Sequence, residues 1–463
     1  IEEVQPGDPT RYRAPQGWMP FETGREIIRV LDGQDRAITL RSTVNGPILT
    51  TPALAQVAPI GHVTAIAWTG AQPDDHSFSA LLGLMTAQDR AGAQVALSDM
   101  VGPVLNVVLA DQRGVGRITA GAVPRRDAAH QTGGRMPAPG WLPENRWQGV
   151  DAAPQPPAPG DGLVSATGEG PGGPRMARLT RLMNSREIHS RDSLIETQLD
   201  IVSPVARQIL PLVGAELWFT GEPAAAGTPE RQRQDALGLL AEWDGAMNEH
   251  LPEPLIYAAW MTALQDRMIR DELGPLSDDI HDLRPGFIEA AFRNTRGAAR
   301  WCDVIQSAPV EDCAAIARQA LDAAILDLSA RHGPDVTSWR WGNAHEAQQI
   351  NPALGRIPGL GWAVNLVQST SGGDFTLALA GSAGFGPLPW RQVTGAGYRA
   401  VYDLADPDSS VFVISTGQSG HPLSRHYDDM AGLWRRGEYV TMSLDPALAR
   451  AAARGTTRLE PAP

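Results

Sequence analysis

The chain contains no lysine, so all 39 of its basic residues are arginine. Lysine forms Schiff bases, serves as the base of Ser-Lys hydrolases and binds phosphate in P-loops. The missing lysine therefore excludes all three kinds of chemistry.

Cysteine is almost as scarce, with only Cys302 and Cys313 in 463 residues. The two residues could close a short disulfide loop in an oxidising compartment. They could equally remain a pair of buried thiols. The spacing alone leaves both alternatives open.

Long hydrophobic runs and a basic patch are absent too. No apolar run reaches the roughly 18 residues that span a bilayer, which predicts no membrane span. The net charge of −13 and a pI near 5.3 disfavour nucleic acid as a partner and favour a small or acyl-type substrate. Because the chain begins with Ile1, we expect a processed or truncated product, whose lack of a signal peptide says nothing about export.

What is present is enough apolar sequence for a large core, with 42% hydrophobic residues. Short alternating runs predict a strand-rich part over residues 1–174. Helical periodicity dominates residues 175–335, and strand patterns return over residues 336–463. Strands at both ends with helices between them favour one interleaved body over separate domains.

Several elements can be predicted individually. Residues 77–96 have the pattern of one helix, and VLNVVLADQRGVGRITAG that of a β-hairpin. Residues 123–173 are rich in proline and glycine, which predicts a long surface connection. Thr228, Pro229 and Glu230 have the order of a helix cap, a first-turn proline and an acid that matches the helix dipole.

The catalytic motifs that the sequence suggests each lack a residue or geometry that they need. GQSGH at 417–421 has His421 where a serine-hydrolase elbow needs glycine. HEAQQ lacks the second histidine of a zinc helix, so we interpret His345 as a surface or hydrogen-bonding residue. Asp428 and Asp429 are adjacent on an expected helix and would point in different directions, as on a solvated face. Spacing alone therefore predicts no catalytic constellation.

Longer strings carry a resemblance when they are taken together and in order. They are GWMPFETGREIIRV, GRMPAPGWLPENRWQGV, LAEWDG, SWRWGNAHEA, STSGGDFTLALAG, GAGYRAVYDLAD and STGQSGHPLSRHYDDMAGLWRRGEYVTM. With them, nearly the whole chain resembles the large, β-type chain of the penicillin acylase family.

The resemblance implies an N-terminal-nucleophile hydrolase with an α+β fold, a four-layer αββα sandwich, here incomplete at its N-terminus. It implies a periplasmic or secreted enzyme whose partner is a small α-type chain from the same precursor. Its substrates would be small N-acyl amides such as β-lactam side chains or N-acyl homoserine lactones. No cofactor is required, although the family allows a structural calcium ion whose ligands the sequence does not identify.

In such enzymes an N-terminal serine attacks the amide carbonyl, and its own α-amino group accepts the hydroxyl proton. Ile1 has neither a hydroxyl nor a thiol, so we expect the nucleophile to lie upstream and this fragment alone to be inactive. Gly168 aligns with the family's oxyanion asparagine, and losing one such donor costs about 10²–10³ in rate.

Three further kinds of site residue follow from the alignment. Arg175 matches the arginine that orients the active-site asparagine and the N-terminus, or it is an ordinary helix-start arginine. Asn106 aligns beside the acyl pocket. Leu105 and Leu84 fall on the pocket wall but are equally well explained as core residues. The alternative hypothesis, favoured by Gly168, is a catalytically degenerate family member that acts as a binding or structural protein.

Overall fold

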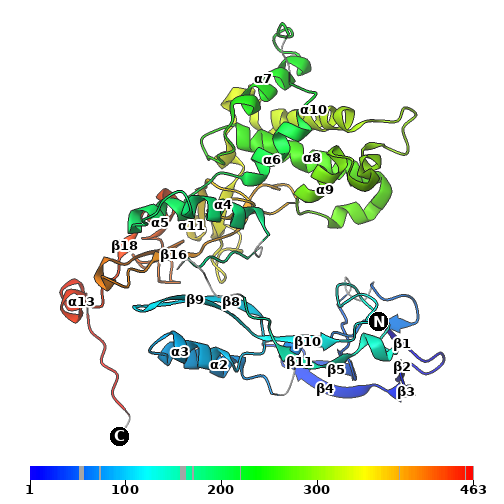
Figure 1. Ribbon diagram of the computed structural model, residues 1–463, viewed down its shortest axis with the longest axis vertical. Helices are drawn as coiled ribbons and strands as arrows, with labels where there is room; N and C mark the ends of the chain where they lie inside the picture. The colour runs from blue at the N-terminus through cyan, green and yellow to red at the C-terminus, as the bar shows by residue number, and fades with distance from the viewer. Residues whose placement is uncertain are drawn as a thin grey trace. The chain divides into compact units, whose positions relative to one another are not determined.

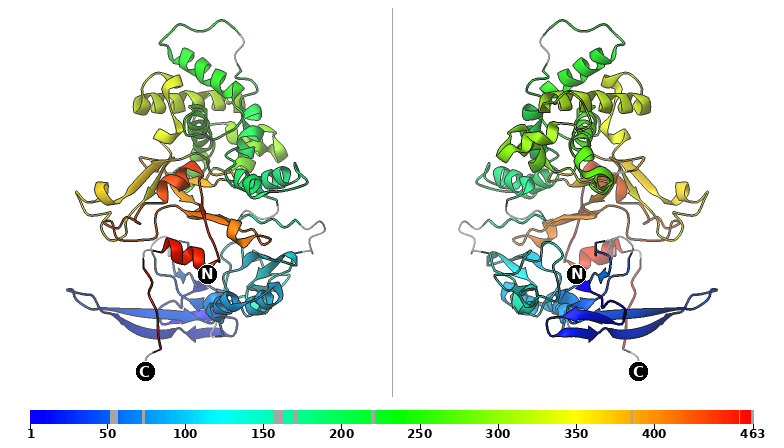
Figure 2. Two further views of the ribbon diagram at one scale, coloured as in Figure 1. Left: turned by 90° about the vertical axis from the view of Figure 1, so that its left-hand side faces the viewer. Right: turned by 90° about the vertical axis from the view of Figure 1, so that its right-hand side faces the viewer.

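The computed structural model describes residues 1–51, 57–71, 74–156, 163–168, 172–218, 221–384, 386–453 and 455–461. The chain divides into two compact units, Ile1–Ala166 and Thr167–Pro463, each of which is described by itself (Figures 1 and 2). Both units contain helices and strands. In the described part of the chain, no helix has the length and apolarity needed to cross a bilayer.

The first unit is built largely from antiparallel strand pairs. β1 pairs with β7, β2 with β3, β8 with β9, β10 with β11, and β4, β5 and β6 form one sheet. The strands are β1 (Glu2–Glu3), β2 (Arg11–Ala14), β3 (Gly17–Pro20), β4 (Glu22–Ile28), β5 (Arg36–Thr43), β6 (Gly46–Pro47), β7 (His62–Val63), β8 (Leu105–Asp111), β9 (Gly114–Ala120), β10 (Ala122–Arg126) and β11 (Trp147–Ala152).

The predicted hairpin is confirmed as β8 and β9, which pair in register from Leu105 opposite Ala120 to Asp111 opposite Gly114. Two helices pack against it, α2 (Ser77–Thr86) and α3 (Arg90–Leu97). The prediction of one helix over residues 77–96 is therefore wrong. Asp89 starts a second helix because its side chain accepts a hydrogen bond from the Gly92 N–H at 2.8 Å, which satisfies a first-turn donor.

The predicted surface connection over residues 123–173 also needs correction, because β10 and β11 form a strand pair within it. Pro124 lies in β10, where a two-stranded sheet leaves one edge of each strand unpaired and so tolerates a missing N–H. Proline and glycine content alone did not reveal this pair.

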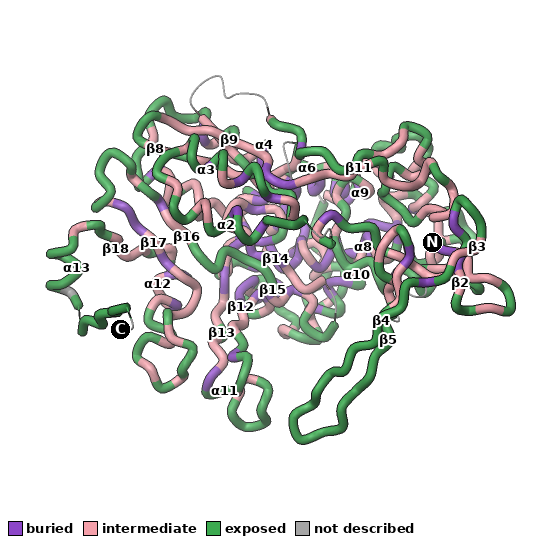
Figure 3. Tube along the Cα trace, turned by 90° about the horizontal axis from the view of Figure 1, so that it is seen from below, coloured by how far each residue is buried: buried purple, intermediate pink, exposed green. Residues whose placement is uncertain are grey.

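The β4–β5 hairpin is the most exposed part of the first unit. Every residue of β4 is exposed, and Figure 3 shows the two strands as a long, exposed arm. The pairing still runs in unbroken register from Glu22 opposite Ser42 to Ile28 opposite Arg36. The arm is therefore held by its own ladder and not by burial.

The second unit begins with helices packed around one apolar core. Figure 1 shows α6 to α10 grouped together. Trp260, Leu264 and Met268 are spaced by four residues and buried, so α8 presents a core face to its neighbours. The helices are α4 (Pro174–Met183), α5 (Arg191–Gln198), α6 (Pro204–Val213), α7 (Pro229–Glu242), α8 (Glu253–Leu273), α9 (Pro285–Phe292) and α10 (Cys313–His332).

Two local features fix the ends of these helices. Thr228 caps α7 as predicted, accepting a hydrogen bond from the Arg231 N–H at 3.2 Å, with Pro229 and Glu230 in the first turn. Cys302 and Cys313 form a disulfide, which answers the question that their spacing left open. The bridge ties the first residue of α10 to the end of a 3₁₀ segment, Thr295–Cys302.

The rest of the second unit contains two small sheets, ordered β13-β12-β15-β14 and β16-β17-β18. Asp428 and Asp429 precede α12 in turns, so the expected helix over them is wrong. The elements are β12 (Glu346–Gln349), α11 (Gly361–Val364), β13 (Leu366–Ser369), β14 (Ala380–Ser382), β15 (Gln392–Gly395), β16 (Tyr398–Val401), β17 (Val411–Ile414), α12 (Ala431–Arg436), β18 (Val440–Thr441) and α13 (Pro446–Ala452).

Candidate active site

Arg175 lies in the first turn of α4, directly after Pro174. Its Nε donates a hydrogen bond to the Thr376 carbonyl at 2.9 Å, across 201 residues of sequence. Thr376 is fully buried, and its hydroxyl accepts from the Gly373 N–H at 3.0 Å and lies 2.8 Å from the Ala378 carbonyl. The arginine is therefore held by a rigid, buried turn.

A second arginine, one turn further along α4, strengthens the same attachment. Arg178 forms a two-pronged ion pair with Asp200, at 2.6 and 3.0 Å, and only 12% of each side chain is exposed. The Asp200 carboxylate raises the pKa of the Arg178 guanidinium through this hydrogen bond. Asp200 also accepts the Ala378 N–H on its carbonyl, at 2.9 Å. Two arginines therefore fasten α4 to the turn around Thr376.

Gly168 lies in an exposed turn shortly before α4. No heavy atom of a described residue lies within 4 Å of the place that a Cβ would occupy, so these residues leave room for a side chain. Glycine itself offers only backbone groups to a substrate. The alignment of Gly168 with the oxyanion asparagine stays a prediction.

The three pocket residues predicted from the sequence lie in the first unit. Leu84 on α2 is half-buried and packs against the small core of Ala80, Leu97 and Met100, as its core interpretation predicts. Leu105 on β8 is 39% exposed.

Asn106 is the neighbour of Leu105 in the strand, so the two side chains point to opposite faces of the hairpin. Its Oδ1 accepts a hydrogen bond from the Thr119 hydroxyl at 3.1 Å. The structure therefore does not bring Leu105 and Asn106 to one face, while Gly168 and Arg175 belong to the other unit.

His345 is buried, so the idea of a surface histidine is wrong and that of a hydrogen-bonding one is right. Its ring stacks on Trp341 with centroids 4.3 Å apart, and Nδ1 lies 2.6 Å from the Trp390 carbonyl. Burial lowers the pKa of His345 to about 4, which keeps the ring neutral. It is a core residue, not a base or a metal ligand.

The sequence analysis missed the carboxyl group of Asp374, an exposed residue next to the Arg175 attachment. Asp374 accepts a hydrogen bond from the Ser382 N–H at 2.7 Å, and partial desolvation of the carboxyl group raises its pKa. It lines a cavity of about 220 Å³ together with Thr376, Tyr257 and Trp390. The string STSGGDFTLALAG contained the only sequence signal for it, since no spacing rule marks a single aspartate.

The sequence model of the penicillin amidase family matches residues 1–451. The chain belongs to the penicillin amidase family. Among relatives of known name, an acyl-homoserine lactone acylase of Pseudomonas putida, QuiP, is 26% identical over 95% of this chain and 56% of its own length. Penicillin acylase 2 proenzyme of a Pseudomonas species is 25% identical over 90% of this chain and 53% of its own length.

This penicillin amidase family chain also resembles a solved structure. Thermostable penicillin G acylase from Alcaligenes faecalis matches with a TM-score of 0.72 at 18% identity, over 100% of this chain and 85% of that one. The likeness confirms the predicted α+β fold of the N-terminal-nucleophile hydrolase type. The chain spans little more than half the length of the curated relatives it matches.

In the residues that the structure describes, no three His, Cys, Asp or Glu side chains gather in a way that could hold a metal ion, and the possible structural calcium stays a prediction. Asp429, one of the acidic pair, instead contacts His426 Nδ1 at 2.7 Å.

The Gly417–His421 segment of this family member does not form a serine-hydrolase site either. The Ser419 hydroxyl accepts a hydrogen bond from the His421 backbone N–H at 3.2 Å, while the imidazole Nδ1 accepts from the Leu423 N–H at 3.1 Å. The ring therefore serves its own turn and is not placed as a base for the serine, as the missing glycine predicted.

Proposed function

We propose that this chain is the large-chain part of an amidohydrolase that cleaves the linear C–N bond of a small N-acyl amine. The observation that carries the proposal is the fixed position of Arg175. A buried turn and a neighbouring ion pair hold it at the start of α4, as an arginine that orients catalytic groups would require. Family membership over residues 1–451 and relatives named as acylases support the same reaction class.

The nucleophile in this proposal is the N-terminal serine of a longer large chain, upstream of Ile1. Its α-amino group, with an ordinary pKa of about 7.7–8.0, accepts the hydroxyl proton as the oxygen attacks the carbonyl. The proton then passes to the leaving amine, and water releases the acid from the acyl-enzyme. Arg175 acts as a positioning residue for the amino group and the oxyanion donor, not as a proton carrier.

The proposed substrates have an apolar acyl group, and N-acyl homoserine lactones and β-lactam side-chain amides are the first candidates. Leu105, which is part exposed on β8, is available as an apolar contact for such a group. A small α-type chain from the same precursor would complete the enzyme, in the periplasm or outside the cell.

The test is an assay of the protein made from its complete gene and purified from its native host. N-octanoyl homoserine lactone and a phenylacetylated amine are offered, and the released amine is measured, alongside N-terminal sequencing of the mature large chain. We expect Arg175→Ala to lower kcat/KM by about 10- to 100-fold, as supporting residues of active sites do.

The matched control is Arg181→Ala, which removes an exposed arginine from the same helix and should leave kcat/KM within about twofold. A positioning role also predicts that Arg175→Ala shifts the pH profile of kcat and that Arg175→Lys restores part of the rate. Equal rates for the Arg175→Ala and Arg181→Ala variants, or a mature chain without an N-terminal Ser, Thr or Cys, would overturn the proposal.

A second candidate function, a non-catalytic binding or structural protein, is favoured by Gly168. Its exposed turn offers no side-chain donor to an oxyanion, yet it has room for one. Gly168→Asn separates the two functions. A gain in kcat over wild type supports an enzyme with a weakened oxyanion site, whereas no turnover by either protein, together with measurable amide binding, supports the second candidate.

A further inference from the structure

A pocket of about 600 Å³ lies in the second unit, between the end of α12, β16 and the segment that follows Thr376. Its walls are largely apolar, with Leu199, Ile201, Leu377 and Leu379 among them. Its size falls in the range of small-molecule sites, about 300–1,000 Å³. The pocket is separate from the residues that the family alignment assigns to catalysis.

The pocket has an unusual charge for this chain. Three arginines, Arg399, Arg435 and Arg436, line it, and no aspartate or glutamate does so among the described residues. The whole chain carries a net charge of −13, so an acid-free, arginine-lined cavity is not what the composition predicts. The pocket is therefore locally suited to an anion.

Two of these arginines already have partners. Arg435 pairs with Glu249 at 2.8 Å and donates to the Ser369 carbonyl at 2.9 Å. Arg436 pairs with Glu438 at 2.8 Å through two parallel hydrogen bonds. Their charges are neutralised, so they do not by themselves demand a ligand.

Arg399 on β16 has no such partner. Its guanidinium lies over the rings of Trp434 and Tyr439, at 5.2 and 5.9 Å from their centroids, and donates one hydrogen bond to the Trp434 carbonyl. Its Nε is buried with no hydrogen-bond partner, and it forms no ion pair with any described residue. Partial burial lowers the pKa of this half-buried guanidinium, which expresses the cost of a cation that has no acidic partner among the described residues.

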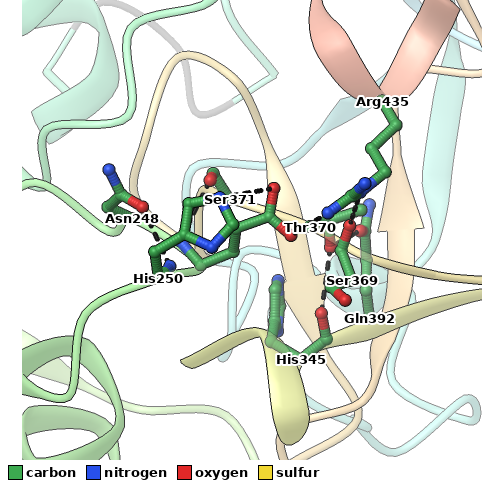
Figure 4. Close-up of polar contacts among 9 residues, drawn as sticks. Asn248, His250, His345, Ser369, Thr370, Ser371, Gln392 and Arg435 are labelled. Atoms are coloured by element: carbon green, nitrogen blue, oxygen red, sulfur yellow. Dashed lines mark hydrogen bonds and ion pairs between the residues drawn. The ribbon is translucent and has the colours of Figure 1, made fainter. Parts of the chain in front are cut away.

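The polar side of the pocket is already fixed in place. Figure 4 shows Thr370 between two partners, with its hydroxyl 2.6 Å from the Gln392 Oε1 and 3.1 Å from the His345 carbonyl. The same view shows Arg435 directed to Ser369. These groups are occupied, so Arg399 is the charged group left to receive a ligand.

We propose that this pocket binds an organic monocarboxylate with an unbranched apolar tail, and that the carboxylate pairs with Arg399. A planar guanidinium matches a carboxylate geometrically and electrically. The ligand would neutralise the half-buried cation while its tail covers the leucine and isoleucine side chains. The proposal does not depend on the amidohydrolase function.

The test is calorimetric titration of the full chain with sodium octanoate, octan-1-ol and octylamine. We expect saturable one-to-one binding of octanoate, at least about tenfold weaker binding of the alcohol, and no binding of the amine. In a series from hexanoate to decanoate, each added methylene should tighten binding by about fourfold. Octanoate binding no tighter than that of octanol would overturn the proposal.

Two variants locate the site. Arg399→Met should weaken octanoate binding at least about tenfold, whereas Arg391→Met, which removes an arginine outside the pocket, should leave it within about twofold. Ala396→Trp keeps Arg399 but places a ring at an exposed lining position, and should also weaken binding. If Arg399→Met fails to fold by circular dichroism, Ala396→Trp decides. Wild-type affinity in the folded variants would refute the assignment.

Discussion

Asp374 shows how a single residue can cost stability. Asp374 is an exposed residue, yet partial desolvation of its carboxyl group raises its pKa, and the carboxyl group accepts a hydrogen bond from the Ser382 N–H. Nearby, the Tyr257 hydroxyl and the Trp390 Nε1 are buried without hydrogen-bond partners among the described residues. Burial of Tyr257 raises the pKa of its hydroxyl, so the group stays neutral. The charged carboxylate is less well solvated in the folded protein than in the unfolded chain, so its charge costs stability.

We expect Asp374→Asn to stabilise the protein at pH 7.5. The folded pKa is raised above the unfolded value, so the folded state binds the proton more tightly, and this contribution to stability is present at low pH. It is lost as the pH rises through the folded pKa. The melting temperature of the asparagine variant should therefore exceed that of wild type at pH 7.5, with the difference shrinking towards pH 4.

The control for this experiment is Asp99→Asn, which neutralises an exposed carboxyl group. It should change the melting temperature little at either pH. A gain for Asp374→Asn that is the same at pH 4 and pH 7.5 would show that its cause is not the charge.

At the residue scale, sequence reasoning worked where the chemistry is local. Thr228 and its two successors predicted a helix start because capping depends on neighbouring residues alone. His345 and Asp374 could not be placed in the same way, because no local pattern marks their surroundings. His345 is buried beside Trp341 and Trp390, and Asp374 contacts Ser382. The roles of Gly168, Arg175 and Asn106 rest on the family alignment and stay predictions.

At the scale of elements, hydrophobic periodicity predicted the long helices α8 and α10 and the β8–β9 hairpin, because each element repeats its own apolar pattern over many residues. It failed at α2 and α3, where the apolar pattern continues across a break set by Asp89. It also failed at β10 and β11, because the two strands are separated by twenty residues of turn-rich sequence. Two strands that pair across so many residues leave no local pattern in the sequence.

The disulfide at the start of α10 yields a prediction at this scale. The double variant Cys302→Ser, Cys313→Ser should lower the free energy of unfolding by about 2 to 3 kcal/mol, because the bridge closes a short loop in the unfolded chain. Urea denaturation followed by circular dichroism measures the change. Dithiothreitol should weaken wild type by a similar amount and leave the double variant unaffected; a response of both proteins would point to another cause.

At the scale of the whole chain, contacts between distant segments define the second unit. The Arg175 bond to Thr376 and the Ala378 bond to Asp200 each join segments that lie far apart in the sequence. No composition or periodicity argument predicts such contacts. The fold was predicted only because strings in the right order resembled a known family, and the likeness to penicillin G acylase confirmed it.

The net charge of the chain predicts how the solubility of the protein depends on pH. With a sequence pI near 5.3 and a net charge of −13 at pH 7, repulsion between molecules should vanish near pH 5.3. Light scattering of the purified protein from pH 4.5 to pH 8 should show least solubility near that pH, with solubility recovering on both sides. A minimum displaced by more than about one pH unit would indicate a strongly uneven titration of the folded surface.

The bridge between Cys302 and Cys313 has a practical consequence, because it takes up both cysteines of the chain. One cysteine introduced by mutation would then be the single thiol open to a maleimide dye under non-reducing conditions. Placed at Ala396, on the rim of the arginine-lined pocket, the dye would report occupancy directly. The absence of lysine keeps amine-reactive reagents away from side chains, so a second probe could be attached selectively at the chain's α-amino group.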